Sequence, residues 1–119
     1  ASINGLVGFS GKSAYNSAKH GVIGLTKVVA LEGAPYGITV NALARVMWNT
    51  ACPESIDRFG KDKEEPLEDV LEEVIYPLVP QRRLLDPEEI SHYALFLASE
   101  KAKSITGQAV VIDAGYTAQ

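Results

Sequence analysis

The stretch Gln108-Ala109-Val110-Val111-Ile112-Asp113 has the character of a strand buried on both faces, because its apolar run is continuous and does not alternate with polar residues. A second, β-branched run of strand length, Ile38-Thr39-Val40-Asn41-Ala42-Leu43, precedes it in the chain. Helical segments separate the two runs, so we expect a parallel pair joined by a right-handed crossover. A parallel pair alone leaves both of its edges open. These residues are therefore expected to be part of a larger α/β sheet.

Two helices are predicted before and between these strands. Residues 12–31 carry small and apolar side chains on more than one face, which favours a helix buried on most sides. A second helix begins at Pro66, and its apolar residues recur at the spacing of a single buried stripe. Pro77 and Pro80 are expected to end this second helix, because proline lacks the N–H that a helix interior needs.

A third helix has strong local start signals. Asp86 is the expected N-cap, Pro87 the first helical residue, and Glu88 and Glu89 place carboxylates at the positive end of the helix dipole. In contrast, residues 44–65 show no sustained period of either kind. We expect a long irregular loop there.

The composition of the 119-residue chain excludes several function classes. With 46% hydrophobic and 22% charged residues it has room for one globular domain, and a formal net charge of −4 argues against a nucleic-acid binder. The single cysteine, Cys52, cannot form an internal disulfide, and His20 and His92 are too far apart to suggest a zinc site. No apolar run reaches the length of a membrane span. We therefore expect a cytoplasmic protein without a metal site and without nucleic-acid or membrane partners.

Tyr15 and Lys19 form the chemically most informative pair. They are four residues apart in the first predicted helix, and this spacing places them on one face, one turn from each other. A tyrosine can donate and accept a proton near neutral pH when a neighbouring ammonium stabilises its phenolate. Ser2, thirteen residues before Tyr15, lies where an opening strand would end, and a glycine-rich loop would bring its hydroxyl back over the helix.

Four spaced motifs can be read along the chain: Ser2, Tyr15-Asn16-Ser17-Ala18-Lys19, Gly37-Ile38-Thr39-Val40-Asn41 and Ile112-Asp113-Ala114-Gly115. Together they resemble the second half of a short-chain dehydrogenase/reductase. Three further segments resemble, more narrowly, the bacterial 3-hydroxybutyrate dehydrogenases: Gly11-Lys12-Ser13-Ala14, Leu78-Val79-Pro80-Gln81 and Gly115-Tyr116-Thr117-Ala118-Gln119. The resemblance implies an α/β fold in which residues 1–119 form the C-terminal part of a single dehydrogenase domain, half of a Rossmann-like doubly wound parallel sheet.

The resemblance also implies a catalytic group and a reaction. Ser2 would hydrogen-bond the substrate oxygen, Tyr15 would transfer the proton, and Lys19 would hold the nicotinamide ribose and support the tyrosine. Hydride would pass to or from NAD. The implied activity is the NAD-dependent oxidation of 3-hydroxybutyrate to acetoacetate by an intact, homo-oligomeric protein.

Four binding residues are implied by the same resemblance. Lys12 would anchor the substrate carboxylate, Asn4 would lie near the substrate, Thr50 would contact the cofactor, and Tyr116 would close the pocket. The residues themselves allow other interpretations. Lys12 can be an exposed charge at a helix start, Asn4 a turn residue that holds its own backbone, and Tyr116 a packing residue.

The chain also departs from the family pattern. The glycine-rich phosphate-binding turn of a dinucleotide fold is not found in these residues, so we expect the chain by itself to be inactive. Ala44-Arg45-Val46-Met47-Trp48 stands where the family carries a Pro-Gly step, and codons for these residues can encode Pro-Gly-Tyr-Val in another frame. We therefore hypothesise that part of residues 44–65 is an out-of-frame reading. Ala114, in place of a family glycine, would be strained if its φ is positive.

Two function classes remain open at this point. One is a piece of a nicotinamide-dependent hydroxy acid dehydrogenase, and the other is a non-catalytic remnant or oligomerisation module of that family. A glycine-rich strand-turn-helix encoded directly upstream would favour the first.

Overall fold

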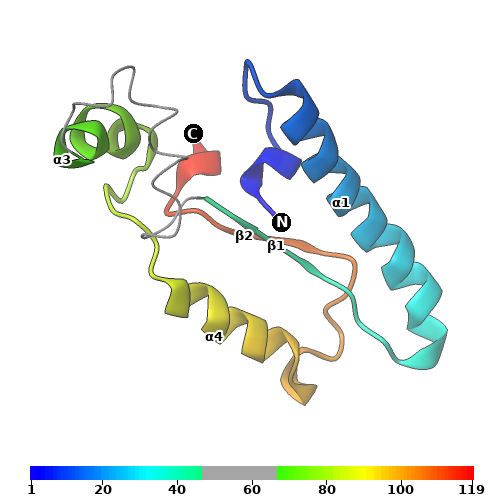
Figure 1. Ribbon diagram of the computed structural model, residues 1–119. Helices are drawn as coiled ribbons and strands as arrows, with labels where there is room; N and C mark the ends of the chain where they lie inside the picture. Colours follow the sequence, from blue (N-terminus) through cyan, green and yellow to red (C-terminus); the bar gives the residue numbers. More distant parts are fainter. Residues whose placement is uncertain (47–66) are drawn as a thin grey trace.

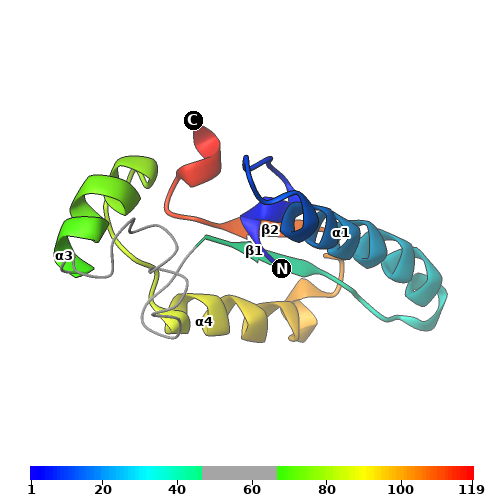
Figure 2. The same ribbon diagram turned by 45° about the horizontal axis from the view of Figure 1, so that its top comes forward.

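The computed structural model describes residues 1–46 and 67–119. The helices are α1 (Ser13–Gly33), α3 (Leu67–Val70) and α4 (Pro87–Leu97), and the strands are β1 (Ala42–Arg45) and β2 (Ala109–Ile112) (Figure 1). The strand pair runs between α1 and α4 in both views (Figures 1 and 2). Helices on both sides of a parallel sheet are the layers of a doubly wound α/β fold, of which this chain forms an incomplete part.

The sheet is parallel, as predicted. β1 and β2 pair in the register that begins with Ala42 opposite Ala109 and ends with Arg45 opposite Ile112. Ser2 adds an isolated parallel bridge to Arg45. Ser2 therefore lies beside the carboxyl end of β1, at the place where a third parallel strand would end.

The first strand differs from the prediction at both ends. Residues 38–41 are not part of the ladder, because they bond to the segment before β2 in an irregular way: the Val40 N–H donates to Thr106 Oγ1 (3.0 Å) and the Asn41 amide to the Ile105 carbonyl (2.8 Å). The ladder begins at Ala42 and continues through Arg45, so the first two residues of the predicted 44–65 loop belong to a strand. The rest of that loop beyond residue 46 lies outside the described residues.

The predictions of burial on several sides were wrong for α1 and β2. In α1 only one stripe is buried, formed by Ile23, Thr26, Ala30 and Gly33. Leu31 on the same helix is 76% exposed, and Val111 of β2 is 39% exposed. The reason is that two strands cover only one side of each element. The Cα radius of gyration, 16.2 Å, accordingly exceeds the value of about 13.5 Å for a compact domain of this length.

The helical segment around α3 is longer and less regular than predicted. After α3 the backbone widens into a π-helical turn over Leu71–Ile75 and then tightens into a 3-10 turn over Tyr76–Leu78. Pro77 does not end the helical run, because it stands in the first turn of the 3-10 helix, where its missing N–H is not required. The run ends at Val79, which is extended.

The start of α4 is confirmed. The Asp86 side chain accepts from the Glu88 N–H (3.0 Å), and the Glu89 carboxylate accepts from the Asp86 N–H (2.8 Å), which completes a capping box. Arg83 pairs with Glu89 at 2.7 Å. This hydrogen bond from Arg83 lowers the pKa of Glu89 to about 2.

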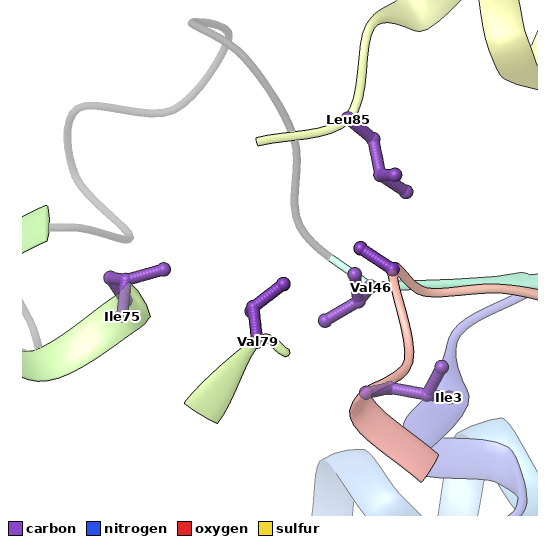
Figure 3. Close-up of a cluster of buried hydrophobic side chains, with 6 residues drawn as sticks. Ile3, Val46, Ile75, Val79 and Leu85 are labelled. Carbon is purple, nitrogen blue, oxygen red and sulfur yellow. The ribbon is translucent and has the colours of Figure 1, made fainter. Parts of the chain in front are cut away.

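One hydrophobic cluster joins parts that are distant in sequence (Figure 3). Its buried members come from the N-terminal turn, the residue after β1, the segment between α3 and α4, and the turn after β2: Ile3, Val46, Ile75, Val79, Leu85 and Ala114. In the part of the chain that the structure describes, no large side chain is fully buried, and no helix is long and apolar enough to cross a membrane. The cluster thus holds the Ser2 turn to the end of the chain.

Candidate active site

Ser2 occupies a turn that is pressed against α1. It precedes a 3-10 turn over Ile3–Gly5, and its Oγ accepts a hydrogen bond from the Asn4 N–H (3.2 Å). A Cβ atom at Gly5 would lie 2.7 Å from the Lys19 carbonyl oxygen. Only glycine therefore allows the turn after Ser2 to pack directly on the helical turn that carries Lys19.

Tyr15 and Lys19 share a face of α1, as their spacing predicts. The Lys19 Nζ lies 5.3 Å from the centroid of the Tyr15 ring, within cation–π range. Tyr15 is 47% exposed and Lys19 is half-buried. The ammonium and the accessible phenol therefore lie on one face of the helix, within one turn of each other.

Lys12 and Asn4 flank this pair. Lys12 is the N-cap residue of α1, and its side chain makes no capping hydrogen bond. Lys12 is half-buried, and its ammonium lies 5.0 Å from the centroid of the Phe9 ring. The contact with Phe9 means that Lys12 is more than a solvated charge at a helix start. Asn4 is part of the 3-10 turn, and its backbone bond to Ser2 supports the turn interpretation.

Tyr116 packs against the hydrophobic cluster of Figure 3. It opens a short 3-10 turn over Tyr116–Ala118 and packs, half-buried, against that cluster, which also contains Ile3. This contact supports the packing interpretation of Tyr116 and connects it to the Ser2 turn. Thr50, the predicted cofactor contact, lies outside the described residues, as does Cys52.

Asp113 has a structural role beside the candidate site that the sequence analysis did not predict. Its buried carboxylate accepts from the Gly115 N–H (2.9 Å), the Thr117 N–H (2.7 Å) and the Thr117 hydroxyl (2.5 Å). Burial by itself raises the pKa of Asp113, but the hydrogen bonds from Thr117 and Gly115 outweigh it, and the net shift is downward. The carboxylate thereby fixes the turn that carries Tyr116. An Asp followed two residues later by Gly is the sequence signature that could have indicated such a turn.

The expected strain at Ala114 is confirmed in its geometry. Ala114 has φ 52° and Gly115 has φ 91°, so two successive residues are left-handed. The Ala114 carbonyl accepts from the Gln81 N–H (3.2 Å), and Pro80 packs against Gly115. The left-handed pair thus attaches the end of the chain to Pro80 and Gln81, which follow the 3-10 turn over Tyr76–Leu78.

Ser2 and Asn4 belong to the turn that packs on α1, while Lys12, Tyr15 and Lys19 lie in or next to the first two turns of that helix. Within residues 1–46 and 67–119, no group of three His, Cys, Asp or Glu side chains could hold a metal ion. The Ser2 bridge to Arg45 marks the carboxyl end of β1, the edge at which open α/β sheets bind nucleotides. The arrangement offers a hydroxyl, a phenol and an ammonium at that edge.

Comparison with known proteins is decisive for the family. Residues 1–117 match the family model described as enoyl-(acyl carrier protein) reductase. The structure is also similar to that of a short-chain dehydrogenase family protein from Francisella tularensis, with a TM-score of 0.91, 28% identity, and coverage of 100% of this chain and 49% of that one. The chain belongs to the short-chain dehydrogenase/reductase family. Its parallel strand pair and flanking helices are therefore a partial Rossmann-like fold.

Two curated relatives are similar over the whole chain. The uncharacterized oxidoreductase YxjF of Bacillus subtilis is 66% identical, and the chain covers 47% of it. A D-beta-hydroxybutyrate dehydrogenase of Rhizobium meliloti is 41% identical, with 46% of it covered. This short-chain dehydrogenase/reductase chain thus spans about half the length of the curated relatives it matches.

Two further solved structures of the family carry nicotinamide cofactors in their names. Actinorhodin polyketide ketoreductase with NADPH has a TM-score of 0.88 and 32% identity, with 98% of this chain and 44% of that chain covered. A 4-hydroxyisoleucine dehydrogenase complexed with NADH has a TM-score of 0.85 and 29% identity, with 100% of this chain and 45% of that chain covered. Solved structures that are similar to this chain thus include one with NADPH and one complexed with NADH.

Proposed function

We propose that the whole protein containing this chain oxidises 3-hydroxybutyrate to acetoacetate with NAD, and catalyses the reverse reduction. The observation that carries the proposal is the Lys19 ammonium 5.3 Å from the Tyr15 ring, beside the turn of Ser2. The similarity to D-beta-hydroxybutyrate dehydrogenases at 41% and 38% identity supports the substrate class.

Each residue has one role in this proposal. The Tyr15 phenolate accepts the proton of the substrate hydroxyl, and the Ser2 hydroxyl hydrogen-bonds the same substrate oxygen. Lys19 stabilises the phenolate and binds the ribose of the nucleotide. Bound NAD supplies the hydride acceptor. The half-buried Lys19 at the nucleotide-binding edge of the sheet fits that ribose, because its ammonium has three donors for the two ribose hydroxyls.

NAD is proposed over NADP because of the resemblance to hydroxybutyrate dehydrogenases. The distinction depends on a residue that contacts the 2′ position of the adenine ribose, which lies in the first half of a dinucleotide fold. Steady-state assays with both nucleotides at equal concentration test this choice. A larger kcat/KM with NADP would replace NAD in the proposal.

The decisive test of the chemistry is Tyr15→Phe in the whole protein. We expect kcat to fall at least about 100-fold, because the variant removes only the hydroxyl that transfers the proton. Tyr36→Phe is the matched control, since Tyr36 lies at the other end of α1 and is 81% exposed. Wild-type turnover by Tyr15→Phe would contradict the proposed mechanism.

The substrate class is tested by Lys12→Ala. A charge-assisted hydrogen bond to a carboxylate contributes roughly 1.5–3 kcal/mol, which corresponds to a loss of about 10- to 150-fold in kcat/KM for 3-hydroxybutyrate. For an uncharged secondary alcohol of similar size, kcat/KM should change little in Lys12→Ala. Lys27→Ala, at an exposed position of α1, is the control for surface charge. Equal losses on both substrates would assign Lys12 a structural role.

The second candidate function, an oligomerisation module, is supported by the apolar face of α1. Leu25 is 62% exposed, Val28 52% and Leu31 76%, in a helix of which only one stripe is buried. We propose that a second copy of the protein covers this face. Light scattering on the whole protein and on Leu25→Glu tests this, with a smaller particle expected for the variant. An oligomer without turnover on any hydroxy acid would favour the module over the enzyme.

A further inference from the structure

Asn16, the residue after Tyr15, joins α1 to the loop that precedes it. Its side-chain amide Nδ2 donates to the Val7 carbonyl oxygen at 2.8 Å. α1 has no side-chain cap at Lys12, and no acidic residue stands in its first turn. The hydrogen bond from Asn16 thus ties the first turn of this helix to the loop through a side chain.

The same bond completes a path from Ser2 to Tyr15. The Gly5 N–H donates to the Ser2 carbonyl (2.9 Å), and the Val7 N–H donates to the Ile3 carbonyl (3.1 Å), so Val7 is part of the turn that begins at Ser2. Asn16 then holds Val7 to the helical turn of Tyr15. Beyond Val7 the loop contains Gly8 and Gly11, the latter with φ 80°, and glycines give the backbone freedom that other residues lack.

The oxygen of the Asn16 amide, Oδ1, indicates that the side chain is oriented by its donor group. Its Oδ1 is buried and accepts no hydrogen bond within the described part of the chain. Turning the amide round would place Oδ1 against the Val7 carbonyl, so the bond to Val7 sets its orientation. An unpaired buried acceptor is costly. An apolar side chain would avoid that cost, but it could not donate to Val7.

We propose that Asn16 is a positioning residue that sets the placement of the Ser2 hydroxyl relative to the Tyr15 hydroxyl. The inference rests on the proposed function, in which both hydroxyls contact one substrate oxygen. Proton transfer requires both contacts at hydrogen-bond distance, and a misplacement of about 1 Å can lower the rate on the order of 100-fold. Asn16 acts through the two residues it joins and does not itself touch the substrate.

The test compares Asn16→Leu with Asn41→Leu in the whole protein. Asn41 also donates its side-chain amide to a backbone carbonyl at 2.8 Å, that of Ile105, but at the amino end of β1, away from Ser2. We expect kcat to fall about 10- to 100-fold in Asn16→Leu, on charged and uncharged alcohols alike, with the KM for the nucleotide within twofold of wild type. Asn41→Leu should lower the thermal stability and leave kcat within twofold.

Asn16→Asp adds a readout that a loss of stability does not mimic. A carboxylate cannot donate to the Val7 carbonyl, whereas a protonated carboxyl can. The ratio of the kcat of Asn16→Asp to that of wild type should therefore rise as the pH falls. If Asn16→Leu does not fold, this ratio tests the positioning role of Asn16.

The outcomes separate the inference from the function on which it rests. A wild-type protein without turnover with NAD or NADP overturns the proposed function, and this inference with it. An active wild type overturns the inference alone if Asn16→Leu keeps kcat within twofold, if Asn41→Leu loses as much kcat as Asn16→Leu, or if the Asn16→Asp ratio does not change with pH.

Discussion

Asp113→Asn should loosen the turn that carries Tyr116. The Asp113 carboxylate accepts three hydrogen bonds, one from the Gly115 N–H and two from Thr117, at 2.5–2.9 Å. The replacement side chain keeps one acceptor oxygen, but it loses the charge, and its NH2 group faces the donors of Thr117.

The size of the effect follows from these contacts. Hydrogen bonds to a charged acceptor contribute about 1.5–3 kcal/mol each, and they do not add fully. We expect Asp113→Asn to lower the free energy of unfolding of the whole protein by about 2–4 kcal/mol. In a protein of about 150–250 residues this lowers Tm by about 4–16 °C.

The pH dependence has a definite sign. The pKa of Asp113 is lower in the folded state than the value of about 3.9 expected for an unfolded chain. The stabilisation is therefore complete above that value and is lost as the pH falls through the folded pKa. The difference in Tm between wild type and Asp113→Asn should be constant from pH 7 to 5.5 and should narrow below about pH 4.

Differential scanning fluorimetry across this pH range measures the Tm of each variant and its change with pH. Asp86→Asn is the matched control, because Asp86 is exposed and asparagine is as good an N-cap as aspartate. The control should change Tm little at any pH. Equal shifts for the two variants at pH 7 would refute the structural role assigned to Asp113.

Two further variants test the packing of the site. Gly5→Ala should destabilise the protein by about 1–3 kcal/mol and lower kcat, because the new Cβ would lie 2.7 Å from the Lys19 carbonyl oxygen. Gly8→Ala is the control, because no atom lies within 4 Å of a Cβ at Gly8. Thermal melts and rate assays should show neither effect for the control. Ala114→Gly should raise the unfolding free energy by about 1 kcal/mol, because an L-residue at φ 52° is strained and glycine is not; a denaturant midpoint at or below that of wild type would contradict this.

Local sequence information was enough to predict the elements whose bonds are local. The capping box at Asp86 lies within four residues, so α4 begins where the sequence indicates. β1 shows the opposite case. The β-branched residues from Ile38 favour a strand, but Val40 and Asn41 bond to residues 105–107, more than sixty positions away, and this overrides the local propensity.

The candidate site divides in the same way. The approach of Lys19 to Tyr15 follows from helical spacing, and the sequence therefore predicts it. The bond from Asn16 to Val7 crosses a glycine-rich loop whose path no periodicity encodes. The turn at Asp113 requires a positive φ at Ala114, which is not a glycine. The sequence predicts strain at Ala114 if its φ is positive, but it does not predict the φ value itself.

The register of the sheet has a consequence for synthesis of the protein on the ribosome. Each residue of β1 pairs with one that is translated 67 positions later, as Ala42 does with Ala109. At about 5–20 residues per second, β1 waits roughly 3–13 s for this neighbour. During this interval the edge of β1 that later pairs with β2 is open to chaperones. Ribosome profiling of chaperone-bound nascent chains should therefore show chaperone binding that ends once β2 has emerged.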